Sequence, residues 1–385
     1  MTVGVWDAQT GESVMNPLEG HSGDVISVAF APDGRHIYSG SRDKTVRVWD
    51  AHTGESVMYL LMDHEGAVRT IAFSLDGRHI LSGSDDKTVR VWDVHMGQGV
   101  MDPLKGHDDW FTTVAFSSDG RHIASGSCDT TVRVWDAHTG QSVMDPLRGH
   151  DSTVTAVAFS PDGRQIVSGS CDTTVRVWDA HTGYSFMHPL EGHYDEISSV
   201  AFSPNGRDIV SGSLDETIRI WDTHTGQSIK NSLEGRSGDV TSVAFSPDGR
   251  HIVSGSDDKA VRVWDAHTGE IVMDLLMGHE GEVRSIAFSP GGRQIVSGSH
   301  DKTVRVWDAH IGQSVMDPLK GHMNGVTSVA FSFDGRHIVS GSDDKTVRVW
   351  DAQMGESAID PLEGHDDYVT SVAFSPDGRH IVSGS

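Results

Sequence analysis

A single interval of 43 residues organises this sequence. Trp-Asp pairs begin at nine positions that are separated by this interval, and no insertion or deletion interrupts the series: Trp6, Trp49, Trp92, Trp135, Trp178, Trp221, Trp264, Trp307 and Trp350. Internal repetition with a period of roughly 20–50 residues indicates an array of similar stacked units. The period therefore constrains the architecture more strongly than any local pattern in the chain.

One complete unit runs from Gly149 to Glu191 and predicts a small antiparallel sheet. Its apolar residues alternate at a period near two, its third run is rich in β-branched residues, and Pro161-Asp162-Gly163 is a turn sequence. Spacings of about ten residues between the runs leave no room for a helix. The expected strands lie at 154–159, 165–168, 174–178 and, more weakly, 184–187. The fold class is therefore all-β.

Such a sheet cannot bury both of its faces alone. Stacking on identical neighbours buries them, and a ring of stacked sheets leaves no terminal sheet exposed. The Gly-His opening, the Ser-Pro-Asp-Gly turn and the closing Val-Trp-Asp resemble the WD-repeat β-propellers, and this likeness covers the whole chain. The resemblance implies a single closed β-propeller of nine four-stranded antiparallel blades spanning residues 1–385.

The two ends of the chain are expected to complete the same blade. The sequence begins inside a third strand at 2–6 and stops after a second strand at 380–383. The closing blade is therefore built from 366–385 plus 1–19, an arrangement that hides both strand edges. The alternative is a fragment of a longer array whose half-blades pair between molecules. A closed ring predicts a monomer.

The charge distribution limits the classes of partner. The chain carries 30 Lys and Arg against 55 Asp and Glu, a formal net charge of −25. Of the basic residues, 22 occupy three repeated scaffold positions, represented by Arg164, Arg176 and Lys302. Because contacts to phosphates dominate nucleic-acid affinity, nucleic acid is not expected as a ligand, whereas basic protein segments are. No apolar run is long enough to span a membrane, and nothing resembles a signal peptide, so a cytoplasmic location is the default expectation.

Each full unit also carries a His, a Ser and an Asp at constant offsets, here His150, Ser168 and Asp172. These residue types form the triad of hydrolases, but an enzyme has no need of one catalytic site in every repeat. The resemblance implies instead a structural hydrogen-bonded tetrad that includes Trp178. Two units depart from the pattern, because Arg236 replaces one His and the closing unit ends before its Asp.

Other signals of chemistry are missing from the sequence. There is no P-loop, no dinucleotide-binding glycine motif and no Cys-x-x-Cys. Cys128 and Cys171 occupy equivalent positions in consecutive units, which indicates two free thiols in place of a disulfide. We therefore expect no catalytic site, no cofactor and no metal.

Two short windows vary between the otherwise similar units. The first window is the three residues after the tetrad His, and the second window is the residue before the tetrad Asp. Fifteen acidic residues fall in these windows, with Arg42 as the one Lys or Arg. Large aromatic side chains enter the first window at Trp110 and Tyr194. Both windows are expected on the same face, where the resemblance implies partner binding; neutral drift on a solvated rim is the alternative.

The leading hypothesis is a non-enzymatic interaction scaffold or sensor module that displays a variable, acidic loop face to protein or peptide partners. The partner would carry a hydrophobic anchor and basic residues. Its expected contacts form three groups: an apolar arc of Trp110, Cys128, Cys171, Tyr194 and Leu214; an acidic rim that includes Asp108, Asp109, Asp195 and Glu196; and a second patch with Met323 and Tyr368. The alternatives are the C-terminal sensor part of a larger NTPase-linked signalling protein and an enzyme built on a propeller scaffold.

Overall fold

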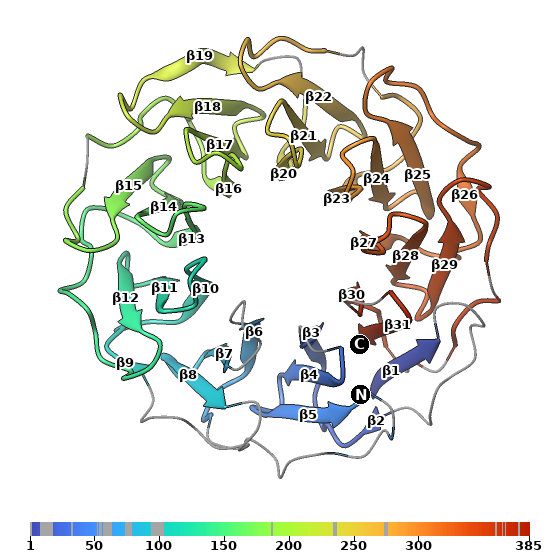
Figure 1. The fold of residues 1–385 in the computed structure, drawn as a ribbon, viewed down its shortest axis with the longest axis horizontal. Coiled ribbons are helices and arrows are strands. Elements are labelled where there is room, and N and C mark those ends of the chain that lie inside the picture. The colour runs from blue at the N-terminus through green and yellow to red at the C-terminus, as the bar shows by residue number, and fades with distance from the viewer. Residues whose placement is uncertain are drawn as a thin grey trace. The chain divides into compact units, whose positions relative to one another are not determined.

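The computed structural model describes residues 2–7, 18–31, 34–51, 53, 56, 64–73, 79–93, 104–185, 188–233, 237–272, 276–358, 360–363, 365, 367–375 and 378–385. Every regular element in these ranges is a β-strand, as the repeat predicts (Figure 1). No helix long and apolar enough to cross a membrane occurs in the described part of the chain.

The chain divides into two compact units. Unit one comprises Met1–Asp63, Val253–Val263 and Val272–Ser385, and unit two comprises His64–Ile252 and Trp264–Ile271.

Unit one contains four sheets whose strands follow chain order, except that the last joins both ends of the chain. These sheets are β3 (Val25–Phe30), β4 (His36–Ser41) and β5 (Val46–Asp50); β23 (Val283–Phe288), β24 (Gln294–Ser299), β25 (Thr303–Asp308) and β26 (Leu319–Lys320); β27 (Val326–Phe331), β28 (His337–Ser342) and β29 (Val347–Asp351); and β2 (Leu18–Glu19), β1 (Thr2–Asp7), β31 (His380–Gly384) and β30 (Ser371–Phe374).

Unit two likewise contains four sheets. These are β6 (Val68–Phe73), β7 (His79–Ser84), β8 (Thr88–Asp93) and β9 (Leu104–Lys105); β10 (Phe111–Phe116), β11 (His122–Ser127) and β12 (Val132–Asp136); β13 (Val154–Phe159), β14 (Gln165–Ser170) and β15 (Val175–Asp179); and β16 (Ile197–Phe202), β17 (Asp208–Ser213), β18 (Ile218–Asp222) and β19 (Ser228–Leu233). The ninth sheet consists of β20 (Val240–Phe245), β21 (His251–Ser256) and β22 (Val261–Asp265).

The expectation of four strands in every blade needs correction. Within the described residues, five of the nine sheets have three strands. In the β13–β15 sheet the fourth segment contributes only isolated bridges, Trp178 to Ser185 and Val175 to Leu190. Residues 186–187 of the expected fourth strand lie outside the described residues.

The core lies between successive sheets within each unit. In unit two, Ala124 and Val132 of the β10–β12 sheet pack with Val154, Ile166 and Trp178 of the β13–β15 sheet. Hydrogen bonds also join neighbouring sheets. For example, the hydroxyl of Thr155 on β13 donates to the carbonyl of Ile197 on β16 at 2.5 Å. These neighbouring sheets therefore bury their facing surfaces against each other, as the stacking argument requires.

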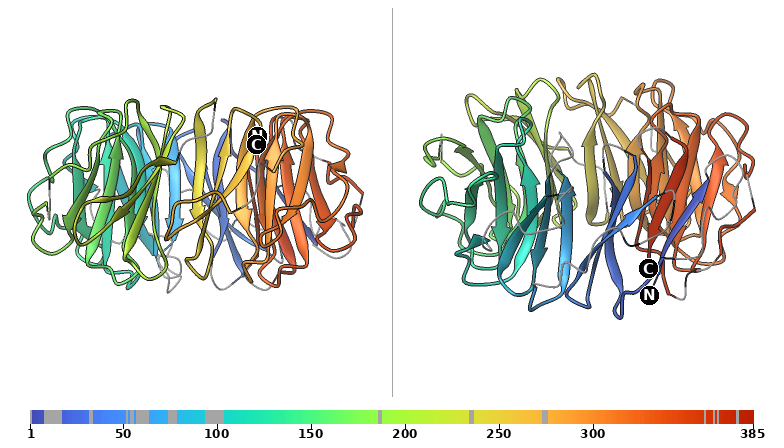
Figure 2. Two further views of the ribbon diagram at one scale, coloured as in Figure 1. Left: turned by 90° about the horizontal axis from the view of Figure 1, so that it is seen from above. Right: turned by 60° about the horizontal axis from the view of Figure 1, so that its bottom comes forward.

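One sheet in unit one joins the two ends of the chain. β1 pairs antiparallel with β31, from Val3 opposite Gly384 to Asp7 opposite His380, and β2 and β30 flank this pair. The two termini lie beside these strands in Figure 1 and close together in both views of Figure 2. The sheet is packed against its neighbour, since Val3 shares a buried cluster with Val25 of β3.

The terminal sheet differs from the others in one packing detail. Gly4 stands where other units have an Arg, such as Arg47, whose guanidinium carbon lies 5.7 Å from the centre of the Trp49 ring. A Cβ atom on Gly4 would overlap the indole of Trp6. The Trp6 ring therefore occupies space over strand β1 that only glycine leaves open.

Candidate functional site

The tetrad of the His150 unit is assembled from three parts of one sheet. His150 precedes β13, Ser168 lies on β14 and Trp178 lies on β15. The Ser168 hydroxyl oxygen is 2.8 Å from His150 Nε2 and also accepts a hydrogen bond from Trp178 Nε1 at 2.8 Å. His150 Nδ1 lies 2.7 Å from Asp172 Oδ2. These partners fit a neutral imidazole that donates from Nδ1 and accepts at Nε2.

The same network recurs in six further units of the described chain. Each has His to Ser, His to Asp and Trp to Ser hydrogen bonds, and the histidines are His21, His64, His107, His193, His279 and His322. The predicted tetrads are therefore confirmed in seven units. Each of the seven networks also contains a Thr that sequence reasoning missed. Its hydroxyl donates to the tetrad Asp, as Thr174 does to Asp172 Oδ1 at 2.7 Å.

The tetrads are unsuited to catalysis although their bonding resembles a Ser-His-Asp triad. Ser168 has no exposed surface, and Trp178 is only 2% exposed. A nucleophile must reach its substrate, and this hydroxyl is enclosed by its own hydrogen-bond partners. Its role is to satisfy polar groups that are buried in the sheet.

The network also sets the protonation of the tetrad carboxyls. Burial acts to raise the pKa of Asp172, but hydrogen bonds from His150, Thr174 and the backbone of Asp151 outweigh it and hold the pKa far below its ordinary value. The pKa values of the six other tetrad carboxyls are lowered in the same way: Asp43, Asp86, Asp129, Asp215, Asp301 and Asp344. Burial lowers the pKa of His21 below its ordinary value of 6.5, although Asp43 opposes the shift.

The two unusual units satisfy their buried groups differently. Arg236 lies outside the described residues. In the same unit Asp258 pairs with a different arginine, because Arg262 Nη2 lies 2.7 Å from Asp258 Oδ2. Both side chains of this pair are buried. In the closing unit, His365 Nδ1 lies 2.8 Å from the hydroxyl of Ser385, which stands in for the carboxylate. His365 Nε2 keeps its contact to Ser383 at 2.6 Å.

The tetrad Asp also holds the variable windows in place. Asp172 Oδ2 accepts the N–H of Asp151, the first residue of the first window, at 2.9 Å. The N–H of Cys171, the second window, donates to the carbonyl of Thr153 at 2.9 Å. The windows are joined by the same backbone bond in six other units, at Arg42, Asp85, Cys128, Leu214, His300 and Asp343. The two windows of a unit therefore lie side by side at one end of its sheet.

The apolar arc lies entirely in unit two. Trp110 is 54% exposed and Tyr194 is 87% exposed, while Cys128, Cys171 and Leu214 are half-buried. In the acidic rim Asp108, Asp195 and Glu196 are exposed and Asp109 is half-buried. The second patch lies in unit one, where Met323 and Tyr368 are both exposed.

The thiol of Cys171, in the apolar arc, contacts Glu196 of the acidic rim. Cys171 and Cys128 are both free cysteines. Burial, followed by a hydrogen bond to Glu196 and the charge of that residue, raises the pKa of the Cys171 thiol to about 11. Glu196 also accepts the Leu214 N–H at its backbone carbonyl, 2.9 Å away. The thiol is therefore neutral at physiological pH and behaves as a small apolar group.

Sequence reasoning missed a set of apolar side chains away from the windows. Phe333, Tyr184, Met354 and Ile311 lie in turns at the opposite ends of their sheets and are all exposed. Phe333 stands where six of the other eight units have Pro, and this replacement was the available signal. Among the described residues, no group of three or more His, Cys, Asp or Glu is placed to hold a metal ion.

Comparison with known proteins gives a consistent result. The sequence model of the WD40 repeat, described as WD domain, G-beta repeat, matches nine segments: residues 11–50, 55–93, 100–136, 140–179, 184–222, 227–265, 270–308, 313–351 and 357–385. The structure is similar to a crystal structure of the computationally designed Ika8 protein, with a TM-score of 0.70 and 36% sequence identity over 86% of this chain and 98% of that one. The search of curated proteins found no match.

We predict that His150→Ala destabilises the fold. The substitution leaves the buried hydroxyl of Ser168 and the carboxylate of Asp172 each short of one partner, which costs about 1–3 kcal/mol. Urea unfolding followed by tryptophan fluorescence measures the change. His181→Ala, in an exposed turn of the same sheet, is the matched control and should shift stability by at most about 0.5 kcal/mol. Equal effects of the two substitutions would contradict the tetrad's role.

We also predict that stability falls in acid in two stages. The folded pKa of His21 is below 6.5, so the unfolded state takes up this proton first and a small loss begins as the pH falls below that value. The tetrad carboxyls, such as Asp172, have folded pKa values below the ordinary 3.8. They therefore stabilise the fold above that pH and lose this contribution as the pH drops further.

Urea unfolding at a series of pH values between about 7 and 3 measures both stages. Asp172→Asn removes one titrating carboxyl, so the stability of this variant should depend less steeply on pH below about 4 than that of the unaltered protein. Parallel pH profiles for the two proteins would count against this explanation.

Proposed function

Because the chain belongs to the WD40-repeat family, we propose that it is a non-enzymatic scaffold or sensor module that presents its variable windows to a protein or peptide. The observation that carries this proposal is the placement of Trp110 and Tyr194. Both aromatic side chains are exposed, yet they extend from backbone segments that tetrad hydrogen bonds hold in place. Exposed aromatic groups on a rigid frame bind a partner with little loss of conformational entropy. WD40 domains are in general non-enzymatic scaffolds, which agrees with the enclosed tetrads.

The chemistry of the apolar arc indicates what the partner carries. Trp110, Tyr194 and the neutral thiol of Cys171 offer apolar surface. Asp195 and Glu196 directly follow Tyr194 in the chain, and both are exposed. A peptide segment with one large apolar side chain flanked by Lys or Arg complements both features, because apolar contact supplies affinity and opposite charge steers association.

The proposal includes a closed nine-bladed ring that acts as a monomer. It is supported by the nine uninterrupted repeats and by the sheet that contains strands from both ends of the chain. Because β1 and β31 pair with each other, neither is left as an open edge for a second molecule. Electron cryo-microscopy of single particles tests this part, with nine blades expected in end-on views. Particles with seven or eight blades, or dimers joined through half-blades, would contradict it.

We predict that Trp110→Ala and Tyr194→Ala each weaken partner binding. Aromatic anchors dominate the energetics of interfaces, so Trp110→Ala should reduce affinity by about 2 kcal/mol or more. Affinity capture from native lysate followed by mass spectrometry identifies the partner, and calorimetry with the purified partner measures the change. Tyr184→Ala is the matched control, because Tyr184 is equally aromatic and exposed but lies in a turn at the other end of its sheet. Unchanged affinity in the Trp110→Ala, Tyr194→Ala double variant would refute the assignment.

A further inference from the structure

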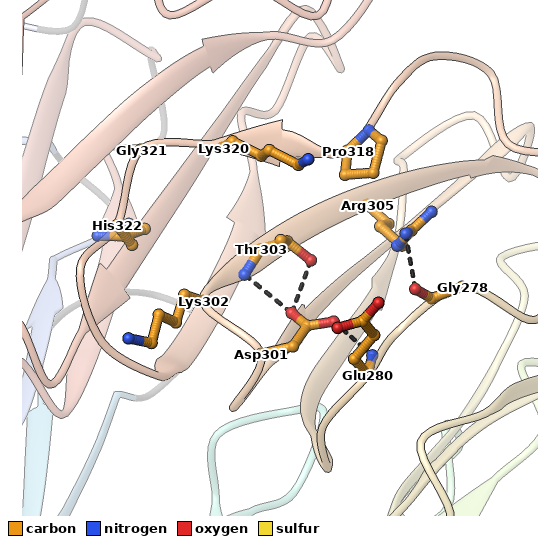
Figure 3. Close-up of a pocket in the computed structure, with 10 residues that line it drawn as sticks. All are labelled: Gly278, Glu280, Asp301, Lys302, Thr303, Arg305, Pro318, Lys320, Gly321 and His322. Carbon is orange, nitrogen blue, oxygen red and sulfur yellow. Dashed lines mark hydrogen bonds between the residues drawn. The ribbon is translucent and has the colours of Figure 1, made fainter.

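A polar pocket in unit one is lined by none of the residues of the apolar arc. It has a volume of about 310 Å³ and is formed by the segment before β23, the turn that leads into β25, and the stretch from Pro318 to His322 (Figure 3). Its charged lining consists of Lys302, Lys320, Arg305, Glu280 and Asp301. Cationic side chains therefore outnumber carboxylates here, although the whole chain is strongly acidic.

The cations of the pocket differ in how firmly they are held. Arg305 donates from Nη2 to the Gly278 carbonyl at 2.6 Å, and its guanidinium carbon lies 5.7 Å from the centre of the Trp307 ring, so its position is set by the scaffold. Within the described part of the chain, the ammonium groups of Lys302 and Lys320 form no hydrogen bond or ion pair. Both are exposed at the pocket and have all their donors available.

The carboxylates of the pocket are not equivalent either. Asp301 accepts hydrogen bonds from His279, from the backbone and hydroxyl of Thr303, and from the Glu280 N–H. Asp301 stays ionised, but these donors enclose it. The Glu280 side chain makes no such bond in the described structure and is exposed, so it is the solvent-facing carboxylate of the lining that would oppose an anion in the pocket.

The corresponding lysine of another sheet shows why this pocket stands apart. The β6–β9 sheet also combines two lysines at these positions, Lys87 and Lys105. There the Lys87 ammonium donates to the Asp108 carbonyl at 2.6 Å, and so it is already occupied. Lys302 has the same place in its own turn but makes no corresponding bond to Met323 in the described structure.

We propose that this pocket binds the phosphate group of a small ligand through Lys320 and Arg305, with Lys302, whose ammonium points away from both in Figure 3, adding positive charge at the rim. Lysine is a point-charge donor suited to phosphate, and arginine adds directional donors. The volume exceeds that of one phosphate ion, so the pocket has room for part of the molecule that carries it. This site shares no residue with the apolar arc or the acidic rim, which lie in unit two, although Glu280 belongs to the first window of its own unit.

Inorganic phosphate is the probe for the test, added to the full chain at constant ionic strength with chloride and succinate as comparison anions. Calorimetry gives the affinity, and changes in the NMR amide shifts of Gly278 and Gly321 locate the bound ion. Phosphate should bind more tightly than either comparison anion. Lys302→Gln and Lys320→Gln should each weaken binding by about two- to fivefold, the range expected for solvent-exposed ion pairs.

Two further variants keep the outcome decisive. Glu280→Gln removes the opposing carboxylate and should tighten phosphate binding by about two- to fivefold, a gain that damage to the fold cannot produce. Lys345→Gln is the matched control, because it makes the same charge change at the same turn position of a sheet that carries Glu363 in place of the second lysine. Phosphate binding no tighter than that of chloride, or equal loss in Lys345→Gln and Lys302→Gln, would overturn the proposal.

Discussion

The fold depends on one buried hydroxyl in each complete repeat. In the β16–β19 sheet of unit two, the oxygen of Ser211 lies 2.8 Å from His193 Nε2 and 2.9 Å from Trp221 Nε1. It thereby connects the second strand, the third strand and the segment that enters the first. Since a buried polar group without partners is costly, removal of any one member penalises the others. The network consequently favours a single register for the whole sheet.

The same network extends from the core to the variable surface. Asp215 Oδ2 accepts hydrogen bonds from both His193 Nδ1 and the backbone N–H of Tyr194. Side chains in the windows can therefore change from repeat to repeat while the backbone below them keeps its path. Because the backbone below the windows keeps its path, nearly identical repeats can present chemically different side chains, such as the exposed aromatic Tyr194 and the exposed carboxylate of Asp108.

Most of the fold could be predicted because the repeat supplies many copies of each signal. The run at 154–159 coincides with β13, and the WD-repeat assignment is confirmed. The fourth strand was overestimated, because alternation in 184–187 does not show how much of this segment pairs with β15; within the described residues it contributes only bridges at Ser185 and Leu190. Thr174 and the Arg262–Asp258 pair were missed since they depend on side-chain geometry within a turn and along a strand. The sequence also could not show that Lys302 makes no bond to a neighbouring carbonyl among the described residues whereas Lys87 does, because this depends on where those carbonyls lie in the structure. The binding roles of Trp110 and Tyr194 stay predictions.

The pairing of β1 with β31 has a mechanical consequence. Val3 lies opposite Gly384, so residues next to the two chain ends meet at the same end of an antiparallel ladder. A pulling force applied to those ends would load the hydrogen-bonded pairs one after another, as in opening a zipper, and would not shear them all together. The ladder that secures the terminal sheet against thermal opening is thus weakly placed to resist tension, and a force on the ends would release this sheet before the others.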